Sequence, residues 1–221
     1  MWLIIPAYNV EPWLEELLQR SSSHIPLSRT LVVDDGSTDG TAQIAQRSGA
    51  FLVRHTSNEG KGKALKTGFE YVLGKGALWC ITMDGDLQHP PEVISKFLEA
   101  AAGNVCDLII GSRDFHSDKM PWDRRFSNWS TSKLLSWVTG QRIHDAQSGY
   151  RMIRADLLKK MDLSSSRYDL ETEMLLKLSR LHARLQWVQI PTIYNQSKSS
   201  INRLGDTLRF IKVVSKFLFD K

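Results

Sequence analysis

Short apolar runs alternate with longer amphipathic stretches in the first half of the chain. The apolar runs predict strands at residues 2–6, 30–34, 50–54, 78–84 and 107–112. The amphipathic stretches predict helices near residues 11–22, 38–48, 61–74 and 90–102. Such alternation is typical of β-α-β units with right-handed crossovers. We therefore expect an α/β fold with a mostly parallel sheet that is flanked by helices on both faces.

The second half of the chain has more helical than strand periodicity. Its pattern predicts helices over 122–140, 167–182 and 204–219, a strand over 184–193, and a loop that leads into a strand over 145–152. No repeat, Gly/Ser-rich linker or clear boundary interrupts the sequence. We therefore expect one continuous domain over residues 1–221.

Composition narrows the class of protein. The 221 residues are 42% hydrophobic and 24% charged, which is ordinary for a globular protein and excludes a mainly disordered chain. No apolar run approaches the ~18 residues of a membrane-spanning helix. The first predicted strand begins at Trp2, which leaves no room for a signal peptide. Cys80 and Cys106 lie in apolar runs without metal-ligand spacing, so we expect buried, reduced thiols and a cytoplasmic location.

The charge balance favours an anionic partner. The formal net charge is +5, which suits a nucleotide, a phosphate, a nucleic acid or an acidic membrane face. We do not expect nucleic-acid binding, because the sequence has no recognised motif and no dense basic run for it.

Polar or glycine-containing segments follow four of the predicted strands. They read PAYN, DDGSTDG, DGDLQH and GSRD. Ligands of open α/β sheets bind at the carboxyl ends of the strands. We therefore expect these four segments to converge on one cleft.

Asp84 and Asp86 follow the predicted strand CITM and are separated by one glycine. Two carboxylates at a strand end can share Mg²⁺ or Mn²⁺, which prefer oxygen ligands and often complete their coordination with substrate phosphates. Gln88 could add a carbonyl oxygen. The alternative is a turn without a metal, because Asp and Gly are common in turns.

Asp34 and Asp35 end another predicted strand, and Ser37, Thr38 or Asp39 can cap the helix that follows. Capping rarely needs two preceding aspartates. A carboxylate at this strand end could accept a hydrogen bond from a nucleobase N–H or a ribose hydroxyl, so a structural and a binding role are compatible here.

The segment from Asn58 to Ala64 opens a predicted helix and contains two glycines. Glycines permit close backbone approach, and a helix N-terminus favours anions. The segment lacks the spacing of a phosphate-binding P-loop, so we do not expect a Walker-type NTPase. Lys61 and Lys63 could equally be solvated surface charges.

Arginines lie in or near polar loops of the same predicted cleft, at Arg113, Arg124, Arg125 and Arg151. Arginine suits bidentate recognition of phosphate. A single arginine is more often a surface residue, but several around one cleft favour a phosphate-rich substrate.

Six segments, in this order, resemble the motifs of the family-2 glycosyltransferases with the GT-A fold, and most closely the polyprenol-phosphate branch that includes the dolichol-phosphate mannosyltransferases. They are PAYN (6–9), VVDDGSTDGT (32–41), NEGKGKAL (58–65), MDGDLQHPPE (83–92), GSR (111–113) and DAQSGYR (145–151). The resemblance implies a GT-A fold with a nucleotide-sugar-binding half (1–113) and an acceptor-binding half (114–221) that ends in an amphipathic helix.

The resemblance also implies a role for each motif. Asp84, Asp86 and Gln88 would hold Mg²⁺ or Mn²⁺ on the diphosphate of a nucleotide-sugar. Arg113 and Arg124 would face an acceptor phosphate. The nucleotide-sugar would be bound by Pro6, Tyr8, Asn9, Asp34, Asp35, Lys61, Asp84, Gly85, Arg151 and Lys198.

Within that donor site, the first motif and either Asp34 or Asp35 would contact the base or ribose. Arg151 would support phosphate charge, and Lys198 would close over the diphosphate. Two departures from the family pattern stand out. Val10 precedes Glu11 where the first motif often ends in Glu, and the segment 194–201 differs from the more basic ending of the mannosyltransferases.

The reaction implied by the resemblance is inverting transfer of a sugar to a polyprenyl phosphate. A divalent cation and nearby Arg or Lys groups would stabilise the leaving diphosphate. A lipid phosphate is already ionised and needs positioning rather than a strong base.

Transfer to a saccharide hydroxyl in cell-surface polysaccharide synthesis is an alternative, and it would need a base. Asp145 is the candidate for that base, and a loop-stabilising role is the other interpretation of Asp145.

Trp122, Trp129 and Trp137 lie among basic residues in one predicted helix, and the last helix mixes lysines with phenylalanines. Aromatic residues with flanking cations suit a membrane interface, so we expect peripheral attachment to a cytoplasmic leaflet. The alternative is that these aromatic side chains complete the core, or an interface with another copy or with a membrane protein.

Two other functions compete with transfer. A nucleotidyltransferase would need a Gly/Arg/Lys-rich loop after the first strand, and PAYNVEPW is not such a loop. A non-catalytic nucleotide-sugar-binding protein would tolerate the loss of the paired aspartates, and both are present.

Overall fold

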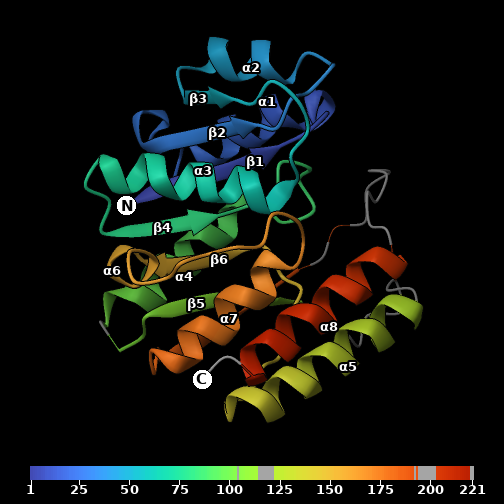
Figure 1. Ribbon diagram of the computed structural model, residues 1–221. Helices are drawn as coiled ribbons and strands as arrows, with labels where there is room; N and C mark the ends of the chain where they lie inside the picture. The colour runs from blue at the N-terminus through green and yellow to red at the C-terminus, as the bar shows by residue number, and fades with distance from the viewer. Residues whose placement is uncertain (104, 114–121, 192, 194–202, 220–221) are drawn as a thin grey trace.

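The computed structural model describes residues 1–103, 105–113, 122–191, 193 and 203–219. A seven-stranded sheet runs through the molecule in the order β3-β2-β1-β4-β6-β5-β7 (Figure 1). Its strands are β1 (Trp2–Ala7), β2 (Thr30–Asp34), β3 (Phe51–Arg54), β4 (Trp79–Thr82), β5 (Leu108–Arg113), β6 (Arg151–Arg154) and β7 (Leu185–Ile190). Neighbouring strands are parallel except where β6 pairs with β4 and β5.

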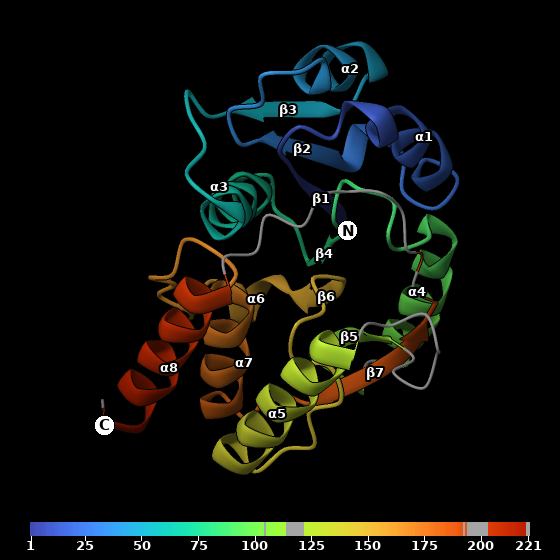
Figure 2. The same ribbon diagram turned by 90° about the vertical axis from the view of Figure 1, so that its right-hand side faces the viewer.

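Helices connect the strands and cover both faces of the sheet (Figure 2). They are α1 (Glu11–Ser21), α2 (Thr41–Ser48), α3 (Lys61–Gly74), α4 (Ile94–Ala102), α5 (Trp122–Thr139), α6 (Ala155–Leu158), α7 (Leu170–Arg180) and α8 (Arg203–Phe219), with short 3-10 turns η1 (Leu27–Arg29) and η2 (Pro91–Val93). The expected α/β fold, with a mostly parallel sheet between helices, is therefore confirmed.

Strand alternation divides the core into two clusters. Leu3 and Ile5 of β1 pack on one face with residues of α1, α2 and α4. Ile4, between them, packs on the opposite face with residues of α3, α5, α6, α7 and α8. Because successive side chains of a strand point to opposite faces, the continuous apolar run at residues 2–5 indicates a strand that is buried on both sides.

The antiparallel strand β6 has a direct consequence for the site. Thr82 of β4 lies opposite Arg151 in the register of the two strands. The start of β6 therefore lies at the edge where β4 ends, and it brings the 145–150 loop to that edge.

Several boundaries differ from the sequence-based expectation. Strand β4 ends at Thr82, so Asp84 lies in the loop that follows. The predicted helix at 90–102 is split into the 3-10 turn η2 and helix α4, which begins at Ile94. Helix α2 begins at Thr41 and not at 38, since residues 37–40 form a turn that is hydrogen-bonded to Asn9 and Glu11.

Two smaller expectations can be compared with the structure. Cys80 and Cys106 are free and buried, as predicted. None of the described helices is both long enough and apolar enough to span a bilayer.

Candidate active site

The loops after β1, β2 and β4 and the loop before β6 meet at the edge of the sheet where the parallel strands end. The main-chain N–H of Asp35 donates to the carbonyl of Ala7 at 2.8 Å, which joins the loops after β2 and β1. The Thr82 hydroxyl donates to the carbonyl of Gly149 at 2.7 Å, which joins the end of β4 to the loop before β6. Three of the four polar segments that we expected to converge, those after β1, β2 and β4, therefore lie at this edge.

An ionic cluster lies at this edge and joins three elements. The Lys61 ammonium at the start of α3 lies 2.7 Å from Asp84 Oδ1 in the β4 loop. It lies 3.0 Å from Glu171 Oε1 in the first turn of α7. Burial opposes the charge on Lys61, but the two carboxylates outweigh it and raise the pKa of Lys61 above its usual value. Burial likewise opposes ionisation of Asp84, yet Lys61 holds the pKa of Asp84 below its usual range.

Asp86 lies beside this cluster in a different electrostatic environment. Its Oδ1 accepts the main-chain N–H of Gln88 at 3.1 Å. Burial and the neighbouring Asp84 carboxylate raise the pKa of Asp86 to about 6. The second carboxylate therefore carries its charge at a free-energy cost that a nearby cation would relieve.

The donor chemistry of this pair fits Mg²⁺ or Mn²⁺. Asp84 and Asp86 offer carboxylate oxygens, and the partly buried Gln88 follows them. Within the part of the chain that the structure describes, no group of three His, Cys, Asp or Glu side chains is arranged to hold a metal. Two protein carboxylates suit a cation that takes its remaining ligands from water and substrate phosphates.

Arg113 and Asp145 form a bidentate ion pair. Arg113 Nε and Nη2 donate to Asp145 Oδ2 and Oδ1 at 2.7 and 2.9 Å. Asp145 is fully buried and also accepts the main-chain N–H of Gln147 at 3.2 Å. The carboxylate is committed to the loop and to Arg113, so the geometry favours the loop-stabilising interpretation of Asp145 over the general base.

Arg151 is buried, and its guanidinium is bound to main-chain carbonyls of this chain. Its guanidinium donates to the main-chain carbonyls of Ser148, Glu171 and Ala146 at 2.8, 2.7 and 2.9 Å. Its exposed fraction is 1%. In this arrangement Arg151 fixes the first turn of α7 against the 146–149 loop, which is an indirect way to support the site.

Asp34 and Asp35 are both buried and both engaged. Asp34 Oδ2 lies 2.9 Å from Arg54 Nε, and its Oδ1 accepts the main-chain N–H of Ser37. Asp35 accepts the main-chain N–H groups of residues 59 and 60 at 3.0 and 2.8 Å, and its Oδ1 lies 2.7 Å from His55 Nδ1. These contacts hold the turn after β2 and the segment before α3. They agree with the structural role that we expected for the two aspartates, and the binding role stays a prediction.

The first motif borders the same edge. Pro6 is buried in β1, whereas Tyr8 is 44% exposed. Asn9 has a left-handed backbone (φ 52°), and its Oδ1 accepts the main-chain N–H of Thr38. Gly85 is buried, and a Cβ there would lie 3.5 Å from the carbonyl of Pro6. The motif therefore presents the Tyr8 ring to solvent beside the DGD loop, in which Gly85 is buried and both aspartates are half-buried.

The glycines before and within α3 admit this chain's own backbone. A Cβ on Gly60 would lie 2.7 Å from the carbonyl oxygen of Ser166, and one on Gly62 would lie 2.6 Å from Arg167 O. The main-chain N–H of Lys63 donates to the Ser166 carbonyl at 2.9 Å. The glycines of NEGKGK thus allow a close backbone approach, as expected, and the segment that approaches them is the 164–167 loop.

Two predicted residues and one missed residue complete the comparison. The side chain of Arg124 and all of Lys198 lie outside the described residues. Glu171 was not identified from the sequence. Its only signal there is an acidic residue near the start of a predicted helix, which is an ordinary position for Glu.

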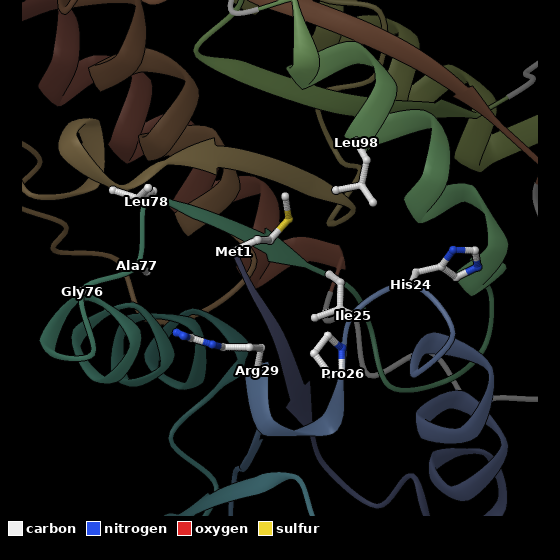
Figure 3. A pocket seen from close by; sticks show the side chains of 9 residues that line it. All are labelled: Met1, His24, Ile25, Pro26, Arg29, Gly76, Ala77, Leu78 and Leu98. Carbon is white, nitrogen blue, oxygen red and sulfur yellow. The ribbon is translucent and has the colours of Figure 1, made fainter.

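A separate cavity lies at the opposite edge of the sheet (Figure 3). It has a volume of about 410 Å³ and is lined by residues that include Met1, His24 and Leu78. Met1 and Leu78 precede β1 and β4, so the cavity lies where these strands begin and shares none of the residues of the ionic cluster.

Known proteins resemble the chain in sequence and in fold. The profile described as Glycosyl transferase family 2 matches residues 2–162. An undecaprenyl-phosphate mannosyltransferase of Micrococcus luteus is 33% identical over 221 residues, which cover 93% of this chain and 89% of the relative. A polyprenol monophosphomannose synthase of Mycolicibacterium smegmatis is 30% identical over 220 residues, with 94% and 82% covered.

The fold also matches a solved glycosyltransferase. The crystal structure of glucosyl-3-phosphoglycerate synthase from Mycobacterium tuberculosis in complex with Mn²⁺ and UDP-glucose has a TM-score of 0.74 at 19% identity, over 97% of this chain and 77% of that one. At this identity the likeness shows the fold, which is the GT-A fold expected from the sequence. The chain therefore belongs to glycosyl transferase family 2 and is a glycosyltransferase.

Proposed function

We propose that this enzyme transfers one sugar, with inversion and with Mg²⁺ or Mn²⁺, from a nucleotide diphosphate-sugar to a polyprenyl phosphate. The observation that carries the proposal is the pair Asp84 and Asp86, with Lys61 beside it, where the parallel strands end. The acceptor class is supported by the similarity, over nearly the whole chain, to two enzymes named for polyprenyl phosphates.

Asp84, Asp86 and Gln88 would hold the divalent cation at this edge. A bound cation supplies Lewis acidity, which stabilises the charge that grows on the leaving nucleoside diphosphate. Lys61 adds a fixed positive charge on the same side, because its pKa is raised and it stays protonated. We assign the base and ribose to the neighbourhood of Tyr8 and of the 34–39 turn, and the donor to the half of the chain from 1 to 113.

The Arg113–Asp145 pair favours a phosphate acceptor over a hydroxyl acceptor. A hydroxyl needs a base, and the Asp145 carboxylate is buried and bound to Arg113 at both oxygens. An ionised phosphate oxygen needs no base, only a cation that orients it. Arg113, held in one orientation by Asp145, suits that task. From the resemblance to the family we also assign Arg124 to the acceptor phosphate and Lys198 to the donor diphosphate.

Peripheral attachment to the cytoplasmic face of a membrane completes the proposal. Helices α5 and α8 both pack on α7 (Figure 2). Trp129 and Trp137 of α5 are 57% and 77% exposed, and Leu208 and Phe219 of α8 are 67% and 84% exposed. Aromatic and aliphatic side chains with neighbouring cations suit a lipid interface, which is where a polyprenyl phosphate resides.

Transfer of labelled sugar from UDP-, GDP- and dTDP-sugars to undecaprenyl phosphate tests the reaction. We expect one donor to react in the presence of Mn²⁺ and the rate to fall to background with EDTA. Absence of transfer from every donor would contradict the proposal.

Liposome flotation tests the proposed attachment to a membrane. We expect the variant with Trp129→Ser and Trp137→Ser to float less with anionic liposomes than the wild-type protein. Equal flotation of the two proteins would contradict the attachment.

A further inference from the structure

We propose that Glu171 is a positioning residue that holds the Lys61 ammonium at the sheet edge. Asp84 is then available as a ligand of a divalent cation. The inference rests on the proposed function, because it assumes that a cation binds at Asp84. It concerns a residue of α7, remote in sequence from the motifs that identify the family.

One ammonium serves two carboxylates in this structure. Lys61 Nζ lies 2.7 Å from Asp84 Oδ1 and 3.0 Å from Glu171 Oε1. A cation that binds Asp84 competes with Lys61 for the same oxygens. With Glu171 as a second partner, Lys61 keeps its countercharge when Asp84 turns to the cation, and it stays in place beside the diphosphate. Without Glu171, Asp84 is the remaining carboxylate of the cluster within reach of Lys61.

Glu171 is fixed where it can do this. Its side chain is 6% exposed. Its main-chain carbonyl accepts Arg151 Nη1 at 2.7 Å, and Arg151 is itself buried. Among the described residues, Glu171 Oε2 is buried and has no hydrogen-bond partner. Removing one partner of a buried ion pair is costly where it leaves the other charge unpaired. In Glu171→Gln the Lys61 ammonium keeps Asp84 as its partner.

The surroundings of Lys61 restrict it further. The Tyr168 ring centroid lies 5.8 Å from the ammonium. A Cβ on Gly149 would lie 2.5 Å from Lys61 Nζ, so the 146–149 loop passes close to the ammonium. Because Lys61 has little room to move, its ion pair with Glu171 weakens its ion pair with Asp84.

The test is Mn²⁺ affinity without nucleotide, measured from the electron paramagnetic resonance signal of unbound Mn²⁺. We expect Glu171→Gln to weaken Mn²⁺ binding about tenfold, because Lys61 then relies on Asp84 alone. Glu171→Asp should weaken it as much, since a side chain shorter by one methylene does not reach the ammonium. Lys61→Met combined with Glu171→Gln should return the affinity to within about twofold of wild type, because the competitor is gone.

Glu173→Gln is the matched control. Glu173 lies on the same helix, and its side chain is 6% exposed, like that of Glu171. It pairs instead with Lys177 and with the 164–165 loop. We expect this control to lower the melting temperature and to leave Mn²⁺ affinity unchanged. Melting curves of every variant check folding, and the double variant removes both charges of the pair if Glu171→Gln alone is unstable.

The outcomes distinguish the positioning role of Glu171 from the proposed metal site. Unchanged affinity in Glu171→Gln would overturn the positioning role. So would wild-type affinity in Glu171→Asp, which would mean that negative charge in the region is sufficient and reach is irrelevant. Absence of Mn²⁺ binding in the wild-type protein would overturn the proposed metal site, and this inference with it.

Discussion

Two pairs of aspartates follow β2 and β4, the strands that flank β1, and they differ in what surrounds them. Asp35 accepts two main-chain N–H groups and contacts His55, and Asp34 is paired with Arg54. Asp84 shares one ammonium with Glu171, and Asp86 lies beside Asp84, whose charge and the burial of the site raise the pKa of Asp86 to about 6. The first pair is held by main-chain N–H groups, Arg54 and His55, whereas the carboxylates of the second pair repel each other.

The difference shows that a carboxylate pair at a strand end has no fixed role. Buried carboxylates that accept main-chain N–H groups hold loops in place. A pair whose members repel each other, as the raised pKa of Asp86 indicates, is poised to bind a cation.

The largest expected effect is the loss of transfer on Asp86→Ala. We expect the rate of sugar transfer with Mn²⁺ to fall about a thousandfold, because one of two carboxylates that stabilise the leaving diphosphate through the cation is lost. The unfolding free energy, measured in urea without metal, should not decrease. A variant that transfers sugar at the wild-type rate would end the contrast between the two pairs.

Asp35→Asn should have the opposite profile. An amide NH₂ faces main-chain donors where the carboxylate accepted them, so buried N–H groups lose partners and the unfolding free energy falls by about 3 kcal/mol. We expect the activity of the folded fraction to be far closer to wild type than that of Asp86→Ala. Urea unfolding, together with rates corrected for the folded fraction, measures both quantities. A stable but inactive Asp35→Asn would instead assign Asp35 to the donor.

The pH dependence of stability separates the pairs by a smaller effect. The pKa of Asp86 is raised from 3.8 in the unfolded chain to about 6, so the folded state binds this proton more tightly. Stability from Asp86 is then fully present below pH 3.8 and is lost as the pH rises through 6. In metal-free protein we expect Asp86→Asn to gain up to about 2 kcal/mol relative to wild type between pH 4 and pH 7. A constant difference across that range would contradict the raised pKa.

The sequence predicted the parts of this site that depend on local pattern. Strand and helix periodicity located the sheet, a strand end located Asp84, and the start of a predicted helix located Lys61. It did not predict the antiparallel direction of β6, because four residues carry no signal of direction. Glu171 was missed for a related reason: its role arises from contact with Lys61, 110 positions away in the chain (171 − 61), and such contacts are set by packing.

Gly149→Ala is expected to have the smallest effect, and it tests the crowding around the charged cluster. A Cβ at this position would lie 2.5 Å from Lys61 Nζ and 3.0 Å from Asp84 Oδ2. Since these atoms end flexible side chains, the fold should adjust at a cost of about 1 kcal/mol or less. The displaced ammonium should raise the KM for the donor about threefold and leave kcat nearly unchanged. Gly74→Ala is the control, because a Cβ there meets nothing within 4 Å. Equal KM values in both variants would mean that Lys61 tolerates displacement, and that the charge left open at Asp84 and Asp86 does not depend on the position of the ammonium.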